Sequence, residues 1–166
     1  MAPFEPQDVE AFARAVQPPL PLLGLDLGTK TIGVAGSDGE QRIATAVETI
    51  RRRKFTPDSE HLARLAAERG AGGLVLGLPL NMDGTEGPRC QATRAFARNL
   101  ARVPALAALP VLLWDERLST VSVERALIAQ DVSRARRAAV VDTLAAVVIL
   151  QAALDRLSHL RREARA

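Results

Sequence analysis

Reactive and aromatic side chains are scarce in this chain. It has one cysteine, two histidines, no tyrosine, four phenylalanines and one tryptophan. A lone cysteine excludes an intramolecular disulfide and a cysteine-rich zinc site, and it suits a reducing compartment. The small number of aromatic rings argues against a base-stacking platform of the OB-fold or RRM kind. His61 and His159 lie in charged stretches, which argues against Ser–His or Cys–His catalysis.

Lysine is scarce too, because Lys30 and Lys54 are the only lysines among 22 basic residues. Arginine favours partners that it can contact with two hydrogen bonds, such as phosphate groups. Nucleic acid is therefore a candidate partner, although codon bias in a GC-rich genome would produce the same excess of arginine. The formal net charge of the chain is only +3.

Long apolar runs are also missing. The longest uncharged helical stretch, residues 143–154, is too short to cross a bilayer. The first residues include Glu5, Asp8 and Glu10, where a signal peptide would be basic and then apolar. We therefore expect a soluble, cytoplasmic protein with no membrane partner.

The order of apolar runs and turn signals predicts an α/β fold of one domain. The chain should form a mixed five-stranded sheet with helices on both faces, and its first, fourth and fifth strands should be parallel. Asp38-Gly39 predicts a two-residue turn between the second and third strands, and Thr56 is expected to cap the helix that follows. The expected strands are 20–27, 31–37, 42–50, 73–78 and 110–114, the expected helices are 6–16, 57–69, 89–102, 119–130 and 137–158, and 131–136 is expected to be a basic loop.

Acidic residues close the strands that should be parallel. Asp26 ends the first strand, Asn81 and Asp83 follow the fourth, and Asp115 and Glu116 end the fifth. The carboxyl ends of parallel strands meet at one edge of a sheet, which is where sites lie in such folds. We therefore expect these acids to gather at one edge.

Asp142 is the only charge in an apolar helical stretch. Ala145 and Ala146, one turn further on, would let this helix approach the sheet closely, so that the carboxylate faces the sheet. A cluster of Asp26, Glu116 and Asp142 would need a cation, and Mg²⁺ or Mn²⁺ suits an all-oxygen set of ligands. Two such ions can activate water and stabilise the leaving oxygen of a phosphodiester. The alternative is that Asp142 lies on a solvated face.

Four ordered motifs carry a resemblance to a known family: "GLDLGTKTIGVAGSD", "LVLGLPLNMDGTEG", "LLWDERLST" and "VDTLAAVVILQAAL". Together they resemble the YqgF/RuvX family of Holliday-junction resolvases, which have an RNase H-like fold. The resemblance implies a metal-dependent nuclease with Asp26, Glu116 and Asp142 as catalytic residues and metal ligands. It also implies processing of the 5′ end of pre-16S rRNA, with cleavage of branched DNA as the alternative.

Two departures from the family pattern affect the expected site and domain organisation. The residues before the linker lie outside the resemblance, so the expected division is an N-terminal extension with a proline-rich linker (1–19), a nuclease domain (20–158) and a basic tail (159–166). Many RNase H-like nucleases also place an acid after the fourth strand, where this chain has Leu80-Asn81. That role must therefore fall to Glu116.

Two alternatives of other classes stay open at this stage. The G-x-D-x-G-T stretch also resembles the first phosphate loop of sugar kinases, actins and Hsp70-type chaperones, an ATP-binding fold. Those proteins use two such domains and a second phosphate loop, which this chain lacks. A catalytically silent nucleic-acid-binding module is the other alternative, and retention of all three acids argues against it.

The expected contacts with nucleic-acid phosphates are basic residues near the acids: Lys30, Arg117, Arg134, Arg136 and Arg137. Arg94, Arg98 and Arg102 form a helical stripe that a solvated face explains equally well. Residues 51–54 are consecutive bases in an expected loop, a further phosphate candidate. The sequence does not choose between RNA and DNA, and it leaves open whether the protein is a homodimer.

Overall fold

Five strands form one mixed sheet in the order β3-β2-β1-β4-β5. The computed structural model describes residues 8–119 and 134–166, with only the backbone over 134–140. β1 is antiparallel to β2, and β2 to β3, whereas β4 is parallel to both β1 and β5. The predicted topology is thus confirmed. The strands are β1 (Leu22–Leu27), β2 (Thr31–Ser37), β3 (Ala44–Arg51), β4 (Gly73–Leu78) and β5 (Val111–Asp115).

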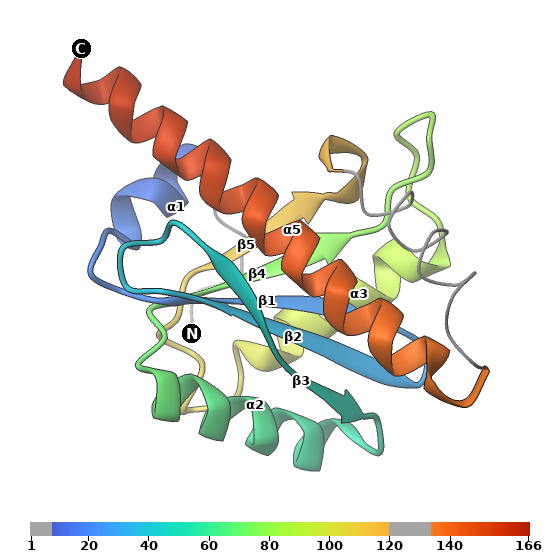
Figure 1. Ribbon diagram of the computed structural model, residues 1–166. Helices are drawn as coiled ribbons and strands as arrows, with labels where there is room; N and C mark the ends of the chain where they lie inside the picture. The colour runs from blue at the N-terminus through green and yellow to red at the C-terminus, as the bar shows by residue number, and fades with distance from the viewer. Residues whose placement is uncertain (1–7, 120–133) are drawn as a thin grey trace.

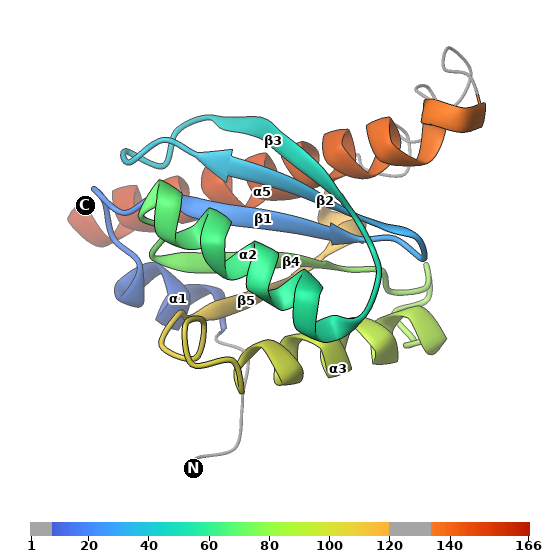
Figure 2. The ribbon, with the colours of Figure 1, turned by 90° about the horizontal axis from the view of Figure 1, so that it is seen from below.

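Helices cover both faces of the sheet, as expected. The long helix α5 crosses one face together with α1 (Figure 1), while α2 and α3 lie on the opposite face (Figure 2). Each face has its own cluster of buried apolar side chains. The helices are α1 (Val9–Ala15), α2 (Phe55–Arg69), α3 (Pro88–Leu100), the 3₁₀ turn η1 (Glu116–Leu118) and α5 (Arg134–Arg165).

The alternation of side chains along β1 decides where its acid points. Leu22 packs in the cluster beneath α5, whereas Leu23 and Leu25 pack in the cluster beneath α2 and α3. Successive side chains of a strand point to opposite faces. Asp26 therefore lies on the face that α5 covers.

The predicted two-residue turn at Asp38-Gly39 is wrong. Ser37 pairs with Ala44, so the connection from β2 to β3 runs over residues 38–43. The Asp38 carboxylate accepts hydrogen bonds from the backbone N–H groups of Arg42 and Ile43, at 2.8 and 3.0 Å. This side-chain contact stabilises a longer loop, in which Gln41 instead of Gly39 has a positive φ, of 57°.

Two helix starts also differ from the prediction. α2 begins at Phe55, before Thr56, because the buried Asp58 carboxylate accepts a hydrogen bond from the Arg53 backbone N–H at 3.2 Å and holds the preceding loop. Its predicted end is confirmed, since Gly70 is left-handed with φ 62°. α5 is already helical at residue 134, so residues 134–136 are not a loop. The predicted helix 119–130 lies outside the described residues except for residue 119. The first part of the predicted loop, residues 131–133, also lies outside them.

Helix α1 and Val16, which follows it, are part of the folded core. Phe12 and Val16 are fully buried under the far end of α5, and the Val16 carbonyl accepts hydrogen bonds from Gln41 Nε2 at 2.6 Å and Arg161 Nη2 at 3.1 Å. Burial lowers the pKa of Arg161. α5 extends to Arg165, beyond its predicted end at residue 158, and these contacts hold that extension in place.

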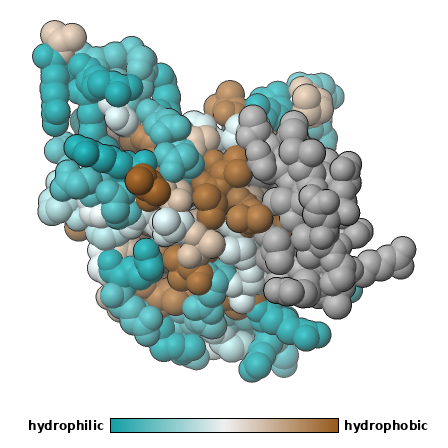
Figure 3. Space-filling view, in the orientation of Figure 1, coloured by the Kyte–Doolittle hydropathy of each residue, from teal (hydrophilic) through white to brown (hydrophobic). Residues whose placement is uncertain are grey.

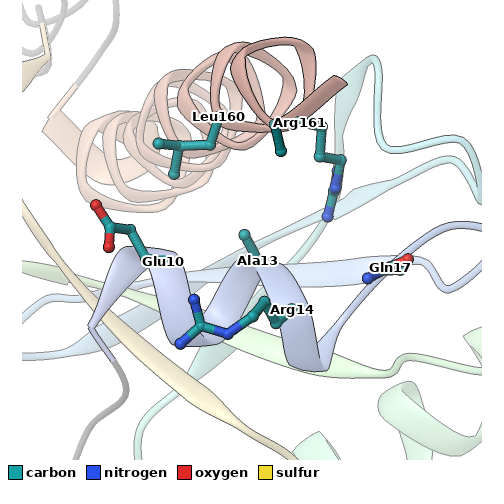
Figure 4. A pocket seen from close by; sticks show the side chains of 7 residues that line it. Glu10, Ala13, Arg14, Gln17, Leu160 and Arg161 are labelled. Atoms are coloured by element: carbon teal, nitrogen blue, oxygen red, sulfur yellow. The ribbon is translucent and has the colours of Figure 1, made fainter. Parts of the chain in front are cut away.

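Helices α1 and α5 flank a hollow of about 310 Å³ (Figure 4). It is lined by Glu10, Ala13, Arg14, Gln17, Leu160, Arg161 and Ala164.

Figure 3 shows the surface of the molecule from the side seen in Figure 1. Outside the grey part, polar side chains dominate the periphery of this surface, and apolar side chains gather near its centre. Leu144, on α5, is 39% exposed. Across the described ranges, 8–119 and 134–166, no helix is long and apolar enough to span a membrane.

Glycines in β1 and β2 let α5 lie unusually close to the sheet. A Cβ atom on Gly24 would lie 2.7 Å from Leu150 Cβ and 3.2 Å from the Ala146 carbonyl oxygen. A Cβ atom on Gly33 would overlap the backbone carbonyl of Asp142. The buried Ala145 and Ala146 contribute the matching small surface of the helix, as predicted.

Gly24→Ala should therefore destabilise the protein, by about 1–3 kcal/mol, which is typical of overpacking in a close-packed core. Leu150 Cβ and the α5 backbone cannot rotate away, so the helix itself must shift. The measurement is the urea midpoint at constant m-value.

Gly87→Ala is the matched control, because a Cβ there would meet only the Asn81 side chain, at 3.7 Å. Equal loss of stability in both variants would contradict the close contact between α5 and β1.

Candidate functional site

Asp26 is flanked by a glycine on each neighbouring strand. It pairs with Gly33 of β2, and on the other side Gly77 of β4 stands one residue beyond the Leu25–Leu76 pair. Although it is a carboxylate, Asp26 is only 2% exposed. The two glycines leave space on the α5 face of the sheet at the level of this carboxylate.

Asp142 enters that space from α5. Its carbonyl lies over Gly33, and its carboxylate lies where a side chain of Gly28 would be. The Thr31 hydroxyl, at the start of β2, donates a hydrogen bond to Asp142 Oδ2. The glycines around Asp26 therefore make room for a second carboxylate, and the solvated-face alternative for Asp142 is wrong.

Glu116 approaches from the opposite side. It is the first residue of η1, directly after β5, and is 7% exposed. A Cβ atom on Gly77 would lie 3.1 Å from Glu116 Oε1. Asp26 therefore lies between the other two acids along the sheet, with Asp142 over Gly33 on one side and Glu116 beside Gly77 on the other. Their joint role as a catalytic cluster stays a prediction.

The three carboxylates do not form a closed metal cage. Within the part of the chain that the structure describes, no three His, Cys, Asp or Glu side chains are grouped closely enough to hold an ion by themselves. Mg²⁺, however, is usually held by one or two carboxylates, with water and substrate phosphate oxygens completing its shell. The all-oxygen donor set and the glycine-lined space fit an ion bound in that way.

Lys30 and Arg117, two of the expected phosphate contacts, differ in their surroundings. Lys30 is exposed and lines a hollow of about 340 Å³, together with Gly28, Thr29, Thr31, Arg89, Val141 and Asp142. Arg117 forms an ion pair with Asp115, with Nη2 2.8 Å from Oδ2. Its hydrogen bonds hold the pKa of Asp115 below the usual range. Only the backbone of Arg134, Arg136 and Arg137 is described, so these three remain predictions.

The loop after β4 is a turn, as expected, and not a cluster of ligands. The Gly84 N–H donates to the Asn81 carbonyl at 2.8 Å, with φ 87° at Gly84. The Thr85 hydroxyl donates a hydrogen bond to the Asp83 carboxylate at 2.6 Å, and this bond lowers the pKa of Asp83.

Other candidate nucleophiles are placed away from this chemistry. His61 pairs with Glu48, and His159 pairs with Glu163, each at 3.0 Å. Burial raises the pKa of the Cys90 thiol, which disfavours the reactive thiolate. The prediction that neither histidine belongs to a catalytic pair is consistent with these contacts.

Two further basic residues, Arg52 and Arg89, line a hollow at the β1–β2 turn. Arg52 belongs to the basic run 51–54, which the sequence predicts as a phosphate candidate, whereas Arg89 is not among the predicted residues. Its place in the sequence could have indicated it, because Arg89 lies in the first turn of the helix that follows the fourth strand, and sites in such folds lie at the carboxyl ends of the parallel strands. Arg94 itself is paired with Glu86.

The fold is that of the RuvC-like, RNase H-fold resolvases. The chain superposes on a structure of Thermus thermophilus RuvC "in complex with Holliday junction substrate" with TM-score 0.52 and 12% identity, covering 83% of this chain and 96% of that chain. The yeast mitochondrial Holliday junction resolvase Ydc2 gives TM-score 0.52 and 12% identity, covering 93% and 86%. This confirms the predicted RNase H-like fold.

The sequence comparisons identify the family. Residues 21–156 match RuvX, described as "Holliday junction resolvase", so the chain belongs to the RuvX family, a family of nucleases that hydrolyse phosphodiester bonds. A Rhodopseudomonas palustris (strain TIE-1) relative named "Putative pre-16S rRNA nuclease" is 69% identical over 141 residues, which cover 85% of this chain and 86% of the relative. One of the same name from Nitrobacter hamburgensis is 64% identical over 145 residues, 87% of each.

Thr31→Val should destabilise the protein by about 1.5–3 kcal/mol, because it removes a hydrogen bond to a partly buried carboxylate while keeping the side-chain shape. Thr31→Ser, which keeps the hydroxyl, should be closer to wild type. The measurement is the free energy of unfolding at neutral pH.

Thr45→Val is the control, since the Thr45 hydroxyl makes only a long 3.4 Å contact with the Gly36 carbonyl. If the Val and Ser variants of Thr31 were equally stable, the hydroxyl would not be what holds Asp142.

Proposed function

We propose that this protein is a divalent-metal-dependent nuclease with Asp26, Glu116 and Asp142 as its catalytic carboxylates, and that it processes the 5′ end of pre-16S rRNA. The observation that carries the proposal is the position of Asp26 between two glycines, with Asp142 on one side and Glu116 on the other. The printed names of the close relatives support the choice of substrate.

We assign the following roles to individual side chains. Asp26, Glu116 and Asp142 would hold Mg²⁺ or Mn²⁺, and the Thr31 hydroxyl fixes the Asp142 carboxylate. Lys30, on the rim of the hollow beside Asp142, would attract the substrate phosphate. When bound, the metal would supply activation of water and stabilisation of the leaving oxygen. Arg117, Arg134, Arg136 and Arg137 are proposed as further contacts with the substrate backbone.

A second substrate, branched DNA, is favoured by one specific observation. One of the solved structures with this fold, Thermus thermophilus RuvC, is bound to a Holliday junction. Membership in a nuclease family argues against the ATP-binding and catalytically silent alternatives.

Cleavage should require Mg²⁺ or Mn²⁺ and should be abolished by EDTA, because several carboxylates beside a phosphodiester repel its negative charge unless a cation lies between them. Ca²⁺ should bind but support little turnover, since its looser coordination suits in-line displacement poorly. The assay is cleavage of a labelled RNA covering the pre-16S 5′ end, with metal added back after chelation. Full activity in EDTA would overturn the metal assignment.

Asp26→Asn should abolish cleavage while keeping the fold and the affinity for nucleic acid, because the amide preserves the shape of the strand end and removes one ligand charge. Wild type and variant are compared with Mn²⁺ on the pre-16S RNA, a four-way DNA junction and ATP. The substrate that only the wild type cleaves identifies the activity.

Asp83→Asn makes the same substitution in the exposed loop after β4 and should leave cleavage close to wild type. If Asp26→Asn cut nucleic acid as fast as Asp83→Asn, the catalytic site would lie elsewhere.

A further inference from the structure

Two guanidinium groups, those of Arg52 and Arg89, contact the backbone of the β1–β2 turn. Arg52 Nη1 donates to the Gly28 carbonyl at 2.7 Å, and Arg89 Nη2 donates to the Leu27 carbonyl at 3.4 Å. The two arginines come from different elements, since Arg52 follows β3 and Arg89 is the second residue of α3.

Arg52 is held firmly in this position. Its backbone N–H donates to the Lys30 carbonyl at 2.9 Å, and its guanidinium carbon lies 5.8 Å from the centre of the Phe96 ring. Phe96 in turn packs edge-on against Phe55, with ring centres 5.6 Å apart. The 3.4 Å contact of Arg89 is long by comparison, so Arg89 is readily redirected to another acceptor.

Neither of these two charges has an acidic partner among the described residues. In the described residues, no carboxylate forms an ion pair with Arg52 or Arg89, whereas Arg94 and Arg117 are paired with Glu86 and Asp115. Backbone carbonyls satisfy hydrogen bonds but carry only partial charge. Two unneutralised guanidinium groups side by side favour an anion between them.

A small hollow lies at this point. Its volume is about 80 Å³, and it is lined by Leu27, Gly28, Thr29, Arg52, Arg89, Ala92 and Thr93. Gly28, Thr29 and Arg89 also line the larger hollow beside Asp142. The small hollow therefore adjoins the larger hollow at the β1–β2 turn, and Arg89 lines both.

We propose that Arg52 and Arg89 form a phosphate subsite, which binds a backbone phosphate of the nucleic-acid strand next to the one that is cleaved. This inference rests on the proposed function for the identity of the strand. The residues that line the hollow include two arginines and two threonines and no aromatic side chain on which a base could stack, so the contact is to the backbone and is independent of sequence. It fixes the register of the strand relative to Asp26 and Asp142.

The first test measures binding in the Asp26→Asn background, where the substrate stays intact. Arg89→Gln keeps a donor for the Leu27 carbonyl but removes the charge, so the slope of log K against log salt should fall by about 0.7–0.9, the contribution of one phosphate contact. Arg162→Gln is the control, because Arg162 lies twenty residues beyond Asp142 on the same helix, roughly 30 Å away. An equal slope for both variants would overturn the subsite.

The second test locates the phosphate. Single neutral methylphosphonate linkages are placed in turn along the strand of a four-way DNA junction. At one position, the neutral linkage should weaken binding about tenfold to the protein that keeps Arg89. The same linkage should weaken binding much less to the Arg89→Gln variant. Absence of such a position would contradict the proposal.

Arg52→Gln separates binding from structure. It should lower the salt slope in the same way, whereas Arg52→Lys should keep the slope because it keeps the charge. If Arg52→Lys lost the slope together with thermal stability, Arg52 would only be supporting the turn and the subsite would be wrong.

The two proposals fail in different ways. A wild type that cleaves nothing, yet whose salt slope depends on Arg89, would refute the nuclease assignment and keep the phosphate site. A wild type that cleaves, with a slope that does not depend on Arg89, would do the reverse.

Discussion

The close approach of α5 to the glycines of β1 and β2 is the contact on which the site depends. Any side chain at Gly24 or Gly33 would push the helix away from the sheet. Asp142 is part of this helix. The distance between the helix and the sheet therefore determines how close the Asp142 carboxylate comes to β1, the strand that contains Asp26. Packing of small residues, a property of the core, thus sets the geometry of the candidate catalytic edge.

That packing opposes an electrostatic cost. Carboxylates on one face of a sheet repel one another and lose hydration when they are buried. Asp26 and Glu116 are 2% and 7% exposed, so solvent screens them little. The apolar cluster beneath α5, with Ile149, Leu150 and Leu154 fully or almost fully buried, holds the helix in place against this repulsion. A bound cation would lower the cost further.

Spacing along the sequence was enough to predict the strand directions in the sheet and that Asp142 faces the sheet, because strand ends and small residues at helical spacing are local signals. Local signals failed where a distant or competing side chain decides the backbone. Asp38 binds two N–H groups of its own loop and replaces the expected turn, and Asp58 moves the start of α2. Arg52 belongs to the basic run that the sequence analysis gives as a phosphate candidate, and only the position of Gly28 in space shows that its guanidinium contacts the β1–β2 turn.

The far end of α5 also bears on the site, although it lies outside the family match at 21–156. The helix is anchored at three levels: by Thr31 beside Asp142, by Gln151, which bonds the Ala44 N–H and the Arg42 carbonyl, and by Arg161 on the Val16 carbonyl. A continuous α-helix transmits a shift at one end along its axis, because each residue is fixed at about 1.5 Å from the next. The N-terminal segment, which holds the last of these anchors, therefore helps to position Asp142 without touching it.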